Sequence, residues 1–165
     1  MLLIAGTSTQ KVLGKLAAGS GLAAALEALT AQQGLTLPAI AAHQIIPQNV
    51  APEVSDQSTV NKYPLVYVYC TRVVNELREK FRAFSGDAQM VVEARVSQDR
   101  LDQIETNLQA YVDAITQVLD SNRGDWGDGV FFDGEYEVSF GGVKHGGRNF
   151  LQIAKIAFAL EISAG

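Results

Sequence analysis

The sequence is typical of an α+β fold, with a mainly antiparallel sheet and two main helices packed on one face of it. Two segments repeat apolar residues at helical spacing, and three shorter ones alternate apolar and polar residues as strands do. The last two strand segments are joined by a glycine-rich loop, and strands joined without a crossover are antiparallel neighbours. With 165 residues, 47% of them apolar, the chain can bury one core, so we expect a single domain over residues 1–165.

The first helix is expected over residues 10–32, a segment rich in Ala and Leu. Its large apolar residues recur near helical spacing, and Gly34 follows where a C-terminal cap would lie. Glycine lowers helix stability, so Gly19 and Gly21 leave a bend in this helix open.

Residues 35–46 favour β-structure, but Pro38 and Pro47 restrict them to an edge strand at best. Residues 47–62 are mostly polar and are expected to form a long loop. Loops of this length in compact domains are often functional.

Residues 65–70 are apolar at every position, which predicts a central strand covered on both faces. Cys70 ends this run and is expected to be a small buried hydrophobe, because a nucleophile would need a histidine placed by the fold. It is the only cysteine, so no intramolecular disulfide can form. Residues 71–84 fit either a short helix or a continuing strand.

Residues 88–96 alternate most clearly and predict a half-buried strand. Ser97 is then expected to cap a helix whose apolar residues, from Leu101 to Leu119, are spaced three and four apart up to Ser121. Residues 122–129 are dense in turn formers and predict a loop.

Two strands are expected near the C-terminus, over residues 135–140 and 150–162, separated by the glycine-rich residues 141–147. At about 3.3 Å per residue the second of them would span roughly 43 Å. That is long for so small a domain, so we expect it to project beyond the sheet or to pair with another subunit.

The charge balance is acidic, with 13 Lys and Arg against 18 Asp and Glu. Tight binding to nucleic acid needs a basic face, so this balance argues against it. Residues 1–5 lack the basic start of a signal peptide, and the Ala-rich residues 16–31 are too interrupted for a membrane span. We therefore expect a soluble protein without membrane contact.

Patterns that mark common enzyme classes are incomplete. The Walker pattern fails because Leu16 follows Gly14 and Lys15 where Ser or Thr is required. A formal dinucleotide-binding pattern, residues 19–24, lies inside a helical segment instead of following a strand. We therefore expect no catalytic residues and no cofactor.

Metal-binding patterns are weak as well. His43 and His145 are the only histidines and show no ligand spacing. Four acids lie close in sequence without forming a calcium loop: Asp125, Asp128, Asp133 and Glu135. We expect solvated turn acids and no metal site, with a small metal-dependent hydrolase built on these acids and a histidine as a less favoured alternative.

Three aromatic residues, Trp126, Phe131 and Phe132, flank a glycine-rich loop. They either cover the end of the local core or anchor an interface with a subunit or partner, where aromatics are enriched. A small binding module that recognises a host protein through the Trp126 loop is a further alternative.

Lys144, His145 and Arg148 form the second candidate interface, a basic tip on an acidic protein. They are either solvated hairpin residues or contacts to a neighbouring ring or to passing DNA phosphates.

Four strings stand out together by their order along the chain: residues 84–86 (FSG), 92–101 (VEARVSQDRL), 111–126 (YVDAITQVLDSNRGDW) and 143–150 (VKHGGRNF). In this order they resemble the tail terminator or head-tail joining (neck) proteins of long-tailed bacteriophages. The resemblance covers about residues 65–162, and none of the strings is a catalytic signature.

The resemblance implies a non-enzymatic virion subunit, made in the host cytoplasm, that assembles as a ring, generally a hexamer. Such a ring caps the tail tube protein, meets the head completion or stopper protein, and lets DNA pass through its lumen. Six copies at −5 each would carry about −30, and a negative lumen would not hold DNA. Another neck connector or a tail-tube subunit is the alternative within this class.

Overall fold

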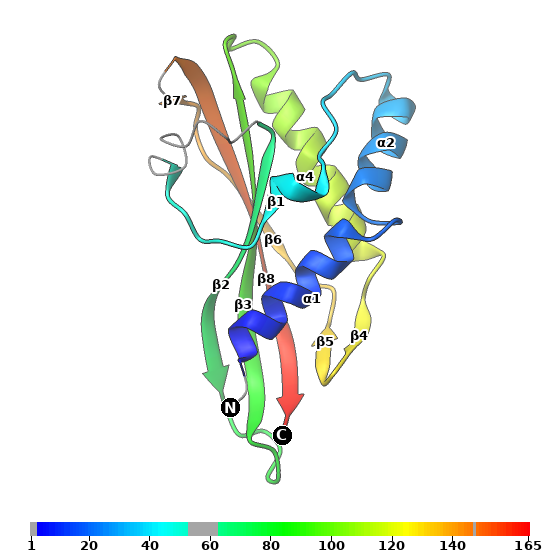
Figure 1. The fold of residues 1–165 in the computed structure, drawn as a ribbon, viewed down its shortest axis with the longest axis vertical. Coiled ribbons are helices and arrows are strands. Elements are labelled where there is room, and N and C mark those ends of the chain that lie inside the picture. The colour runs from blue at the N-terminus through cyan, green and yellow to red at the C-terminus, as the bar shows by residue number, and fades with distance from the viewer. Residues whose placement is uncertain (1–2, 53–62, 147) are drawn as a thin grey trace.

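The computed structural model describes residues 3–52, 63–146 and 148–165, and within them it confirms the α+β fold. Three α-helices lie on one face of a curled, mostly antiparallel sheet of eight strands (Figure 1). The loop expected over residues 47–62 lies outside the described residues from 53 onward.

The helices are α1 (Ile4–Ala17), α2 (Leu22–Gln33) and α4 (Ile104–Asp120), with the short 3-10 helix η1 (Ala42–Gln44) between the last two. The strands are β1 (Ile45–Ile46), β2 (Leu65–Asn75), β3 (Phe84–Gln98), β4 (Gly124–Gly127), β5 (Val130–Phe132), β6 (Glu137–Phe140), β7 (Lys144–Gly146) and β8 (Asn149–Ala164).

The centre of the sheet is the antiparallel pair β3 and β8, which runs from Phe84 opposite Ala164 to Gln98 opposite Phe150. The strand order is β1-β2-β3-β8-β5-β4, and β6 and β7 also pair with β8. At about 3.3 Å per residue, the 16 residues of β8 span roughly 50 Å. The strand is as long as predicted, but it does not project beyond the sheet, because β3 pairs with it from Phe150 to Ala164. Its own chain supplies strands on both sides.

The first half of β2, Leu65 to Tyr69, is buried on both faces as predicted, but the strand is not central. β1 pairs only with Val66 and Tyr67, and no other strand among the described residues lies outside β2. Val66 faces the helices, whereas Tyr67 packs on the opposite face with the segment near Val50. The second face of β2 is therefore buried by an irregular segment and not by further strands.

The segment predicted as one helix is two helices. The chain breaks after α1 and turns through residues 18–21, where a Cβ on Gly21 would collide with the Leu16 and Lys15 carbonyl oxygens. Gly34 has a φ of 66° and ends α2 as a left-handed cap, as predicted. The sheet face therefore carries three helices instead of two.

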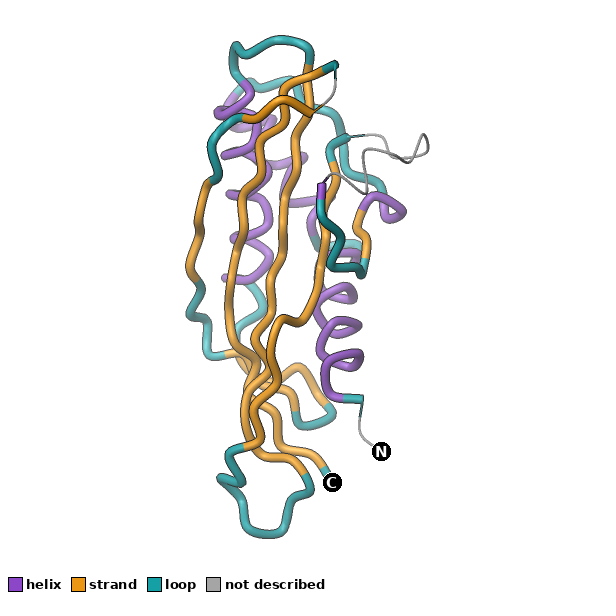
Figure 2. Tube along the Cα trace, turned by 90° about the vertical axis from the view of Figure 1, so that its left-hand side faces the viewer, coloured by secondary structure: helices purple, strands orange, loops and turns teal. Residues whose placement is uncertain are grey.

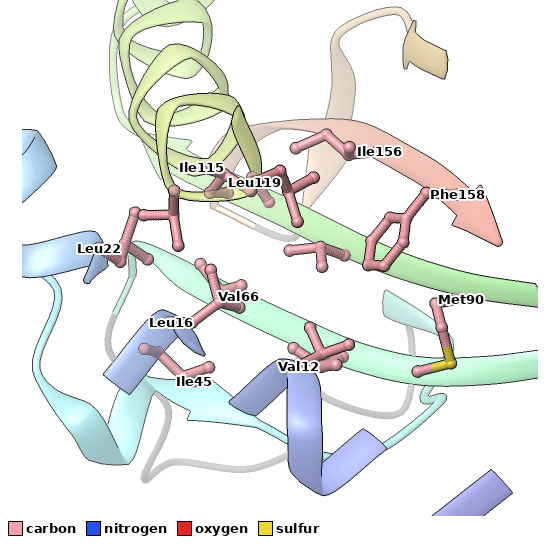
Figure 3. Close-up of a cluster of buried hydrophobic side chains, with 14 of the residues drawn as sticks. Val12, Leu16, Leu22, Ile45, Val66, Met90, Ile115, Leu119, Ile156 and Phe158 are labelled. Carbon is pink, nitrogen blue, oxygen red and sulfur yellow. The ribbon is translucent and has the colours of Figure 1, made fainter. Parts of the chain in front are cut away.

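The core lies between these helices and the sheet. Figure 3 shows Val12 and Leu16 of α1 and Leu119 of α4 converging on Ile156 and Phe158 of β8. The alternation predicted for the last strand is confirmed, because its Ala154 to Ile162 series is buried and the intervening residues are partly or fully exposed.

The helix α4 has the predicted apolar face and ends at Asp120, but it begins later than expected. Ser97 does not cap it, because β3 continues to Gln98. The Gln98 side chain instead donates hydrogen bonds to the carbonyls of Arg100 and Asp102 and closes the turn. Leu101, expected on the buried face, is exposed in that turn.

Two further segments differ from expectation. Residues 122–129, predicted as loop, contain β4, which forms a hairpin with β5. Residues 71–84, which fitted either a helix or a strand, continue β2 to Asn75 after a bulge near Thr71 and then form a turn.

The strand predicted as half-buried, within β3, is buried on both faces. Glu93 and Arg95 are only 4% and 1% exposed and form an ion pair with each other. The Arg95 guanidinium lies 4.0 Å from the centre of the Tyr67 ring, and the Tyr69 hydroxyl donates a hydrogen bond of 2.9 Å to Glu93. The polar side of the alternation is thus a paired, covered network and not a solvated face.

Among the described residues, no single helix is long and apolar enough to cross a membrane. The bent pair of α1 and α2 meets that criterion jointly, on length and composition alone.

Breaking the buried ion pair is expected to cost far more than breaking a surface pair. Glu93→Gln should lower the free energy of unfolding by about 3 kcal/mol, because the buried Arg95 guanidinium then loses the charge of its buried Glu93 partner. Asp102→Asn, which removes the exposed partner of Arg100, should change it by less than about 0.5 kcal/mol. Urea unfolding followed by Trp126 fluorescence measures both, and equal losses would contradict this assignment.

Stability is also expected to fall at high pH. Burial raises the pKa of the Tyr69 and Tyr111 hydroxyls above the ordinary value of 10. The unfolded chain therefore releases these protons first, so the stabilisation is complete below pH 10 and declines as the pH rises above it. In the double variant Tyr69→Phe/Tyr111→Phe, the free energy of unfolding should decline less steeply between pH 10 and 11.5 than in the wild type. An unchanged slope would contradict this account.

Candidate interaction site

The three predicted aromatic anchors separate into two groups. Trp126 is 7% exposed and Phe132 is fully buried, with ring centres 5.5 Å apart, and Phe132 also meets Phe158. The interface interpretation is therefore wrong for these two residues, which complete the core. Phe131, between them in sequence and on the opposite side of β5, is 44% exposed.

The three predicted basic residues lie together on the surface. Lys144 and His145 are on β7 and Arg148 is in the turn before β8, and all three are exposed. The His145 ring lies 5.4 Å from the Phe150 ring, which holds it against the hairpin.

The structure does not bring the aromatic and basic candidates into one site. Phe131 is paired with Glu161 and His145 with Phe150, eleven residues apart on β8 (161 − 150), or about 36 Å. Figure 1 shows β7 at the upper end of the sheet and β5 near the lower end. The molecule therefore offers two separate ends.

A third candidate, absent from the sequence predictions, is the turn between β2 and β3 over residues 76–83. Phe81 is 96% exposed and Leu77 is 64% exposed, the highest and third-highest values among the large apolar side chains of the described residues. In Figure 2 this turn extends beyond the ends of all the helices. In the sequence these two apolar residues stand among five charged ones, which indicates an exposed segment. The near-helical spacing of the apolar residues in 71–84 obscured this signal.

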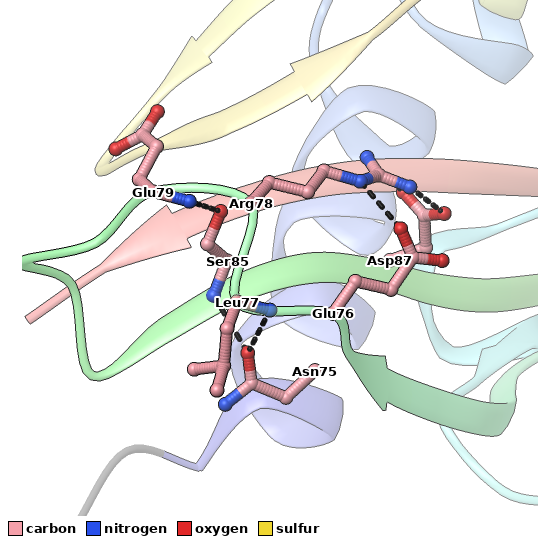
Figure 4. A network of polar contacts seen from close by, with 7 residues as sticks. All are labelled: Asn75, Glu76, Leu77, Arg78, Glu79, Ser85 and Asp87. Carbon is pink, nitrogen blue, oxygen red and sulfur yellow. Dashed lines mark hydrogen bonds and ion pairs between the residues drawn. The ribbon is translucent and has the colours of Figure 1, made fainter.

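The turn is held rigidly at its base by side-chain caps (Figure 4). The Asn75 amide oxygen accepts hydrogen bonds from the Leu77 and Ser85 N–H groups, at 3.2 and 3.0 Å. The Ser85 hydroxyl accepts a hydrogen bond from the Glu79 N–H, and the Ser163 hydroxyl donates one to the Glu79 carboxylate. These contacts join the turn to β3 and to the end of β8.

Arg78 links the turn to the sheet electrostatically. Its guanidinium donates to both carboxylate oxygens of Asp87, at 3.1 and 2.7 Å, and to Glu76 at 2.6 Å. These hydrogen bonds, to Glu76 first and then to Asp87, raise the pKa of the Arg78 side chain, so it stays charged. A bidentate pair of this kind fixes orientation as well as distance.

The backbone at Leu77 is strained. Its φ is 50°, a region that bulky residues rarely occupy. Such a conformation persists only when surrounding contacts hold it, and here Asn75 and Ser85 supply them. A strained, well-anchored turn that keeps two large apolar side chains in solvent is typical of a binding surface.

A hollow of about 230 Å³ lies next to this turn. Its walls come from Arg78 and Glu79 of the turn, Phe131 of β5, and Glu161 and Ser163 of β8. The exposed aromatic predicted from the sequence thus joins the turn that the sequence did not single out, and together they form the lower end of the molecule.

No group of three or more His, Cys, Asp or Glu side chains in the described ranges is placed to hold a metal ion. Asp128 is exposed and bound to Lys11 at 2.7 Å, which lowers the pKa of its carboxyl. Cys70 is half-buried against the core, and burial raises the pKa of its thiol, which disfavours a nucleophilic thiolate.

The sequence matches no protein-family model and no curated protein.

Removing the Asn75 cap should loosen the turn. Asn75→Ala deletes the acceptor for the Leu77 and Ser85 amides, and the loss of such a hydrogen bond costs about 1 kcal/mol. We expect the exchange of these two amide hydrogens to accelerate roughly fivefold or more. Asn75→Asp keeps the acceptor and loses only the bond to Ala83, so it should exchange nearly as slowly as the wild type. Equal exchange in wild type and Asn75→Ala would show that the cap does not hold the turn.

Proposed function

We propose that the protein is a ring-forming structural subunit of a bacteriophage neck, and specifically the tail terminator that caps the tail tube and joins it to the head. The resemblance of four ordered strings over residues 65–162 suggested this role. The observation that carries the proposal is the pair of exposed and chemically different ends on one rigid β3–β8 pair.

A ring-forming terminator needs unlike contact surfaces, for the next copy in its ring and for its protein partner at the tube or the head. The lower end presents Leu77, Phe81 and Phe131, and aromatic side chains such as these two phenylalanines are enriched at protein interfaces. The upper end presents Lys144, His145 and Arg148, which suit an acidic protein surface or the phosphates of passing DNA. Their separation of about 36 Å along β8 allows one subunit to contact both neighbours at once.

The net charge supports the same role. A chain with a net charge of −5 repels DNA weakly. Six copies around a lumen would add their negative potentials and repel DNA more strongly. DNA could then pass without being held, while the basic residues remain confined to one hairpin.

Assembly experiments test the proposal directly. Light scattering and electron microscopy of the purified protein should show closed rings, and added tail tubes should carry one ring at an end and stop growing. A protein that stays monomeric at every concentration, both alone and with tubes, would refute the proposal. Self-polymerisation into long tubes would instead identify a tail-tube subunit.

A further inference from the structure

The most exposed aromatic residue of the described chain has no role within its own subunit. Phe81 is 96% exposed although the turn that carries it is tightly anchored, and Lys80 precedes it. No ion pair to Lys80 exists among the described residues. We define Lys80 and Phe81 as the knob, an aromatic side chain beside a free cation.

A surface of complementary character lies on the same chain. Phe131 borders the hollow of about 230 Å³, and Glu161 is its register partner on β8. Gly86 and Gly129 also line the hollow, and each lies so close to a backbone oxygen, of Val74 and Ser163 respectively, that a Cβ could not fit. We define this hollow, with Phe131 and Glu161, as the socket.

The charges of the two surfaces are opposite. Asp87 on β3 is the register partner of Glu161 on β8, and Arg78 neutralises it. Glu161 has no cation partner in the described part of the chain. The knob therefore pairs an aromatic ring with an unpaired cation, and the socket pairs an aromatic wall with an unpaired anion. Two phenyl rings in edge-to-face or offset-stacked contact stabilise each other by more than the burial of their apolar area alone provides.

We infer that the knob of one copy seats in the socket of a second copy, with Phe81 against Phe131 and Lys80 paired with Glu161. Phe81 does not fill the socket of its own subunit, since it is almost fully exposed and does not line the hollow. In a ring, the knob and the socket of one copy engage two different neighbours, so the contact is head-to-tail, and such contacts close into rings when the rotation between copies allows it. The inference rests on the self-assembly part of the proposed function and not on its phage role.

Charge reversal tests this contact. Phe81→Ser, Lys80→Glu and Glu161→Lys should each raise the concentration needed for half-maximal assembly about tenfold or more, as loss of an interface anchor does. Mixing Lys80→Glu with Glu161→Lys in equal amounts should restore most of the assembly, because each knob then meets a socket of opposite charge. Light scattering measures particle size, and circular dichroism verifies that each variant is folded.

Matched controls are available at the opposite end of β3. Leu101→Ser removes another exposed apolar side chain, and Arg100→Glu reverses another exposed charge, so both should assemble like the wild type. If these controls fail equally, the effect is general and the inference falls.

The possible failures are distinguishable. Rings that form unchanged with Phe81→Ser or Lys80→Glu would overturn the inference and leave the ring proposal intact. Wild-type protein that stays monomeric, or stops at a symmetric dimer, would overturn the head-to-tail contact, as would the absence of rescue in the mixture. Rings that depend on the knob but do not cap tail tubes would support the inference and refute the terminator role.

Discussion

The antiparallel pairing of β3 with β8 is the contact on which the other features depend. The two strands are in register over fifteen consecutive positions, so their alternation of side chains is shared along the whole length. One face of this pair forms the sheet side of the core, and α1 and α4 pack against it. The same pair carries β6 and β7 toward one end and β5 toward the other, and thereby sets the distance between the two exposed ends.

The two faces of the pair are covered very differently. The helices and the β4–β5 hairpin cover one face, whereas aromatic residues of β2 and the segment near Val50 close the other face near Glu93 and Arg95. Farther along, Ala157 and Glu161 of β8 are exposed and Ala159 is partly exposed. The outer face is therefore sealed by a buried ion pair in its upper half and left open beside the socket in its lower half, where the chain has surface to offer a neighbour.

Rigidity and exposure occur together at the β2–β3 turn. A flexible turn with exposed apolar residues would lose conformational entropy on binding, which weakens association. Here the Asn75 cap and the Arg78–Asp87 pair fix the backbone in advance, so Leu77 and Phe81 are presented in one arrangement. The proposed assembly role would benefit from this property, because each subunit would then recognise its neighbours without a folding step.

Local sequence patterns were sufficient to define the α+β class, the apolar face of α4, the cap at Gly34 and the buried series of β8. Each depends on residue spacing along one element, and helix and strand geometry convert spacing into a face directly. Patterns could not show that Glu93 and Arg95 are buried, that β2 lies near the edge, or that Trp126 and Phe132 face inward while Phe131 and Phe81 face solvent. Those outcomes depend on which distant segments pack together: the residues near Val50 against β2, and α1 against the β4–β5 hairpin through Lys11. The same residue types can be core or surface, and contacts between segments far apart in the chain decide which they become.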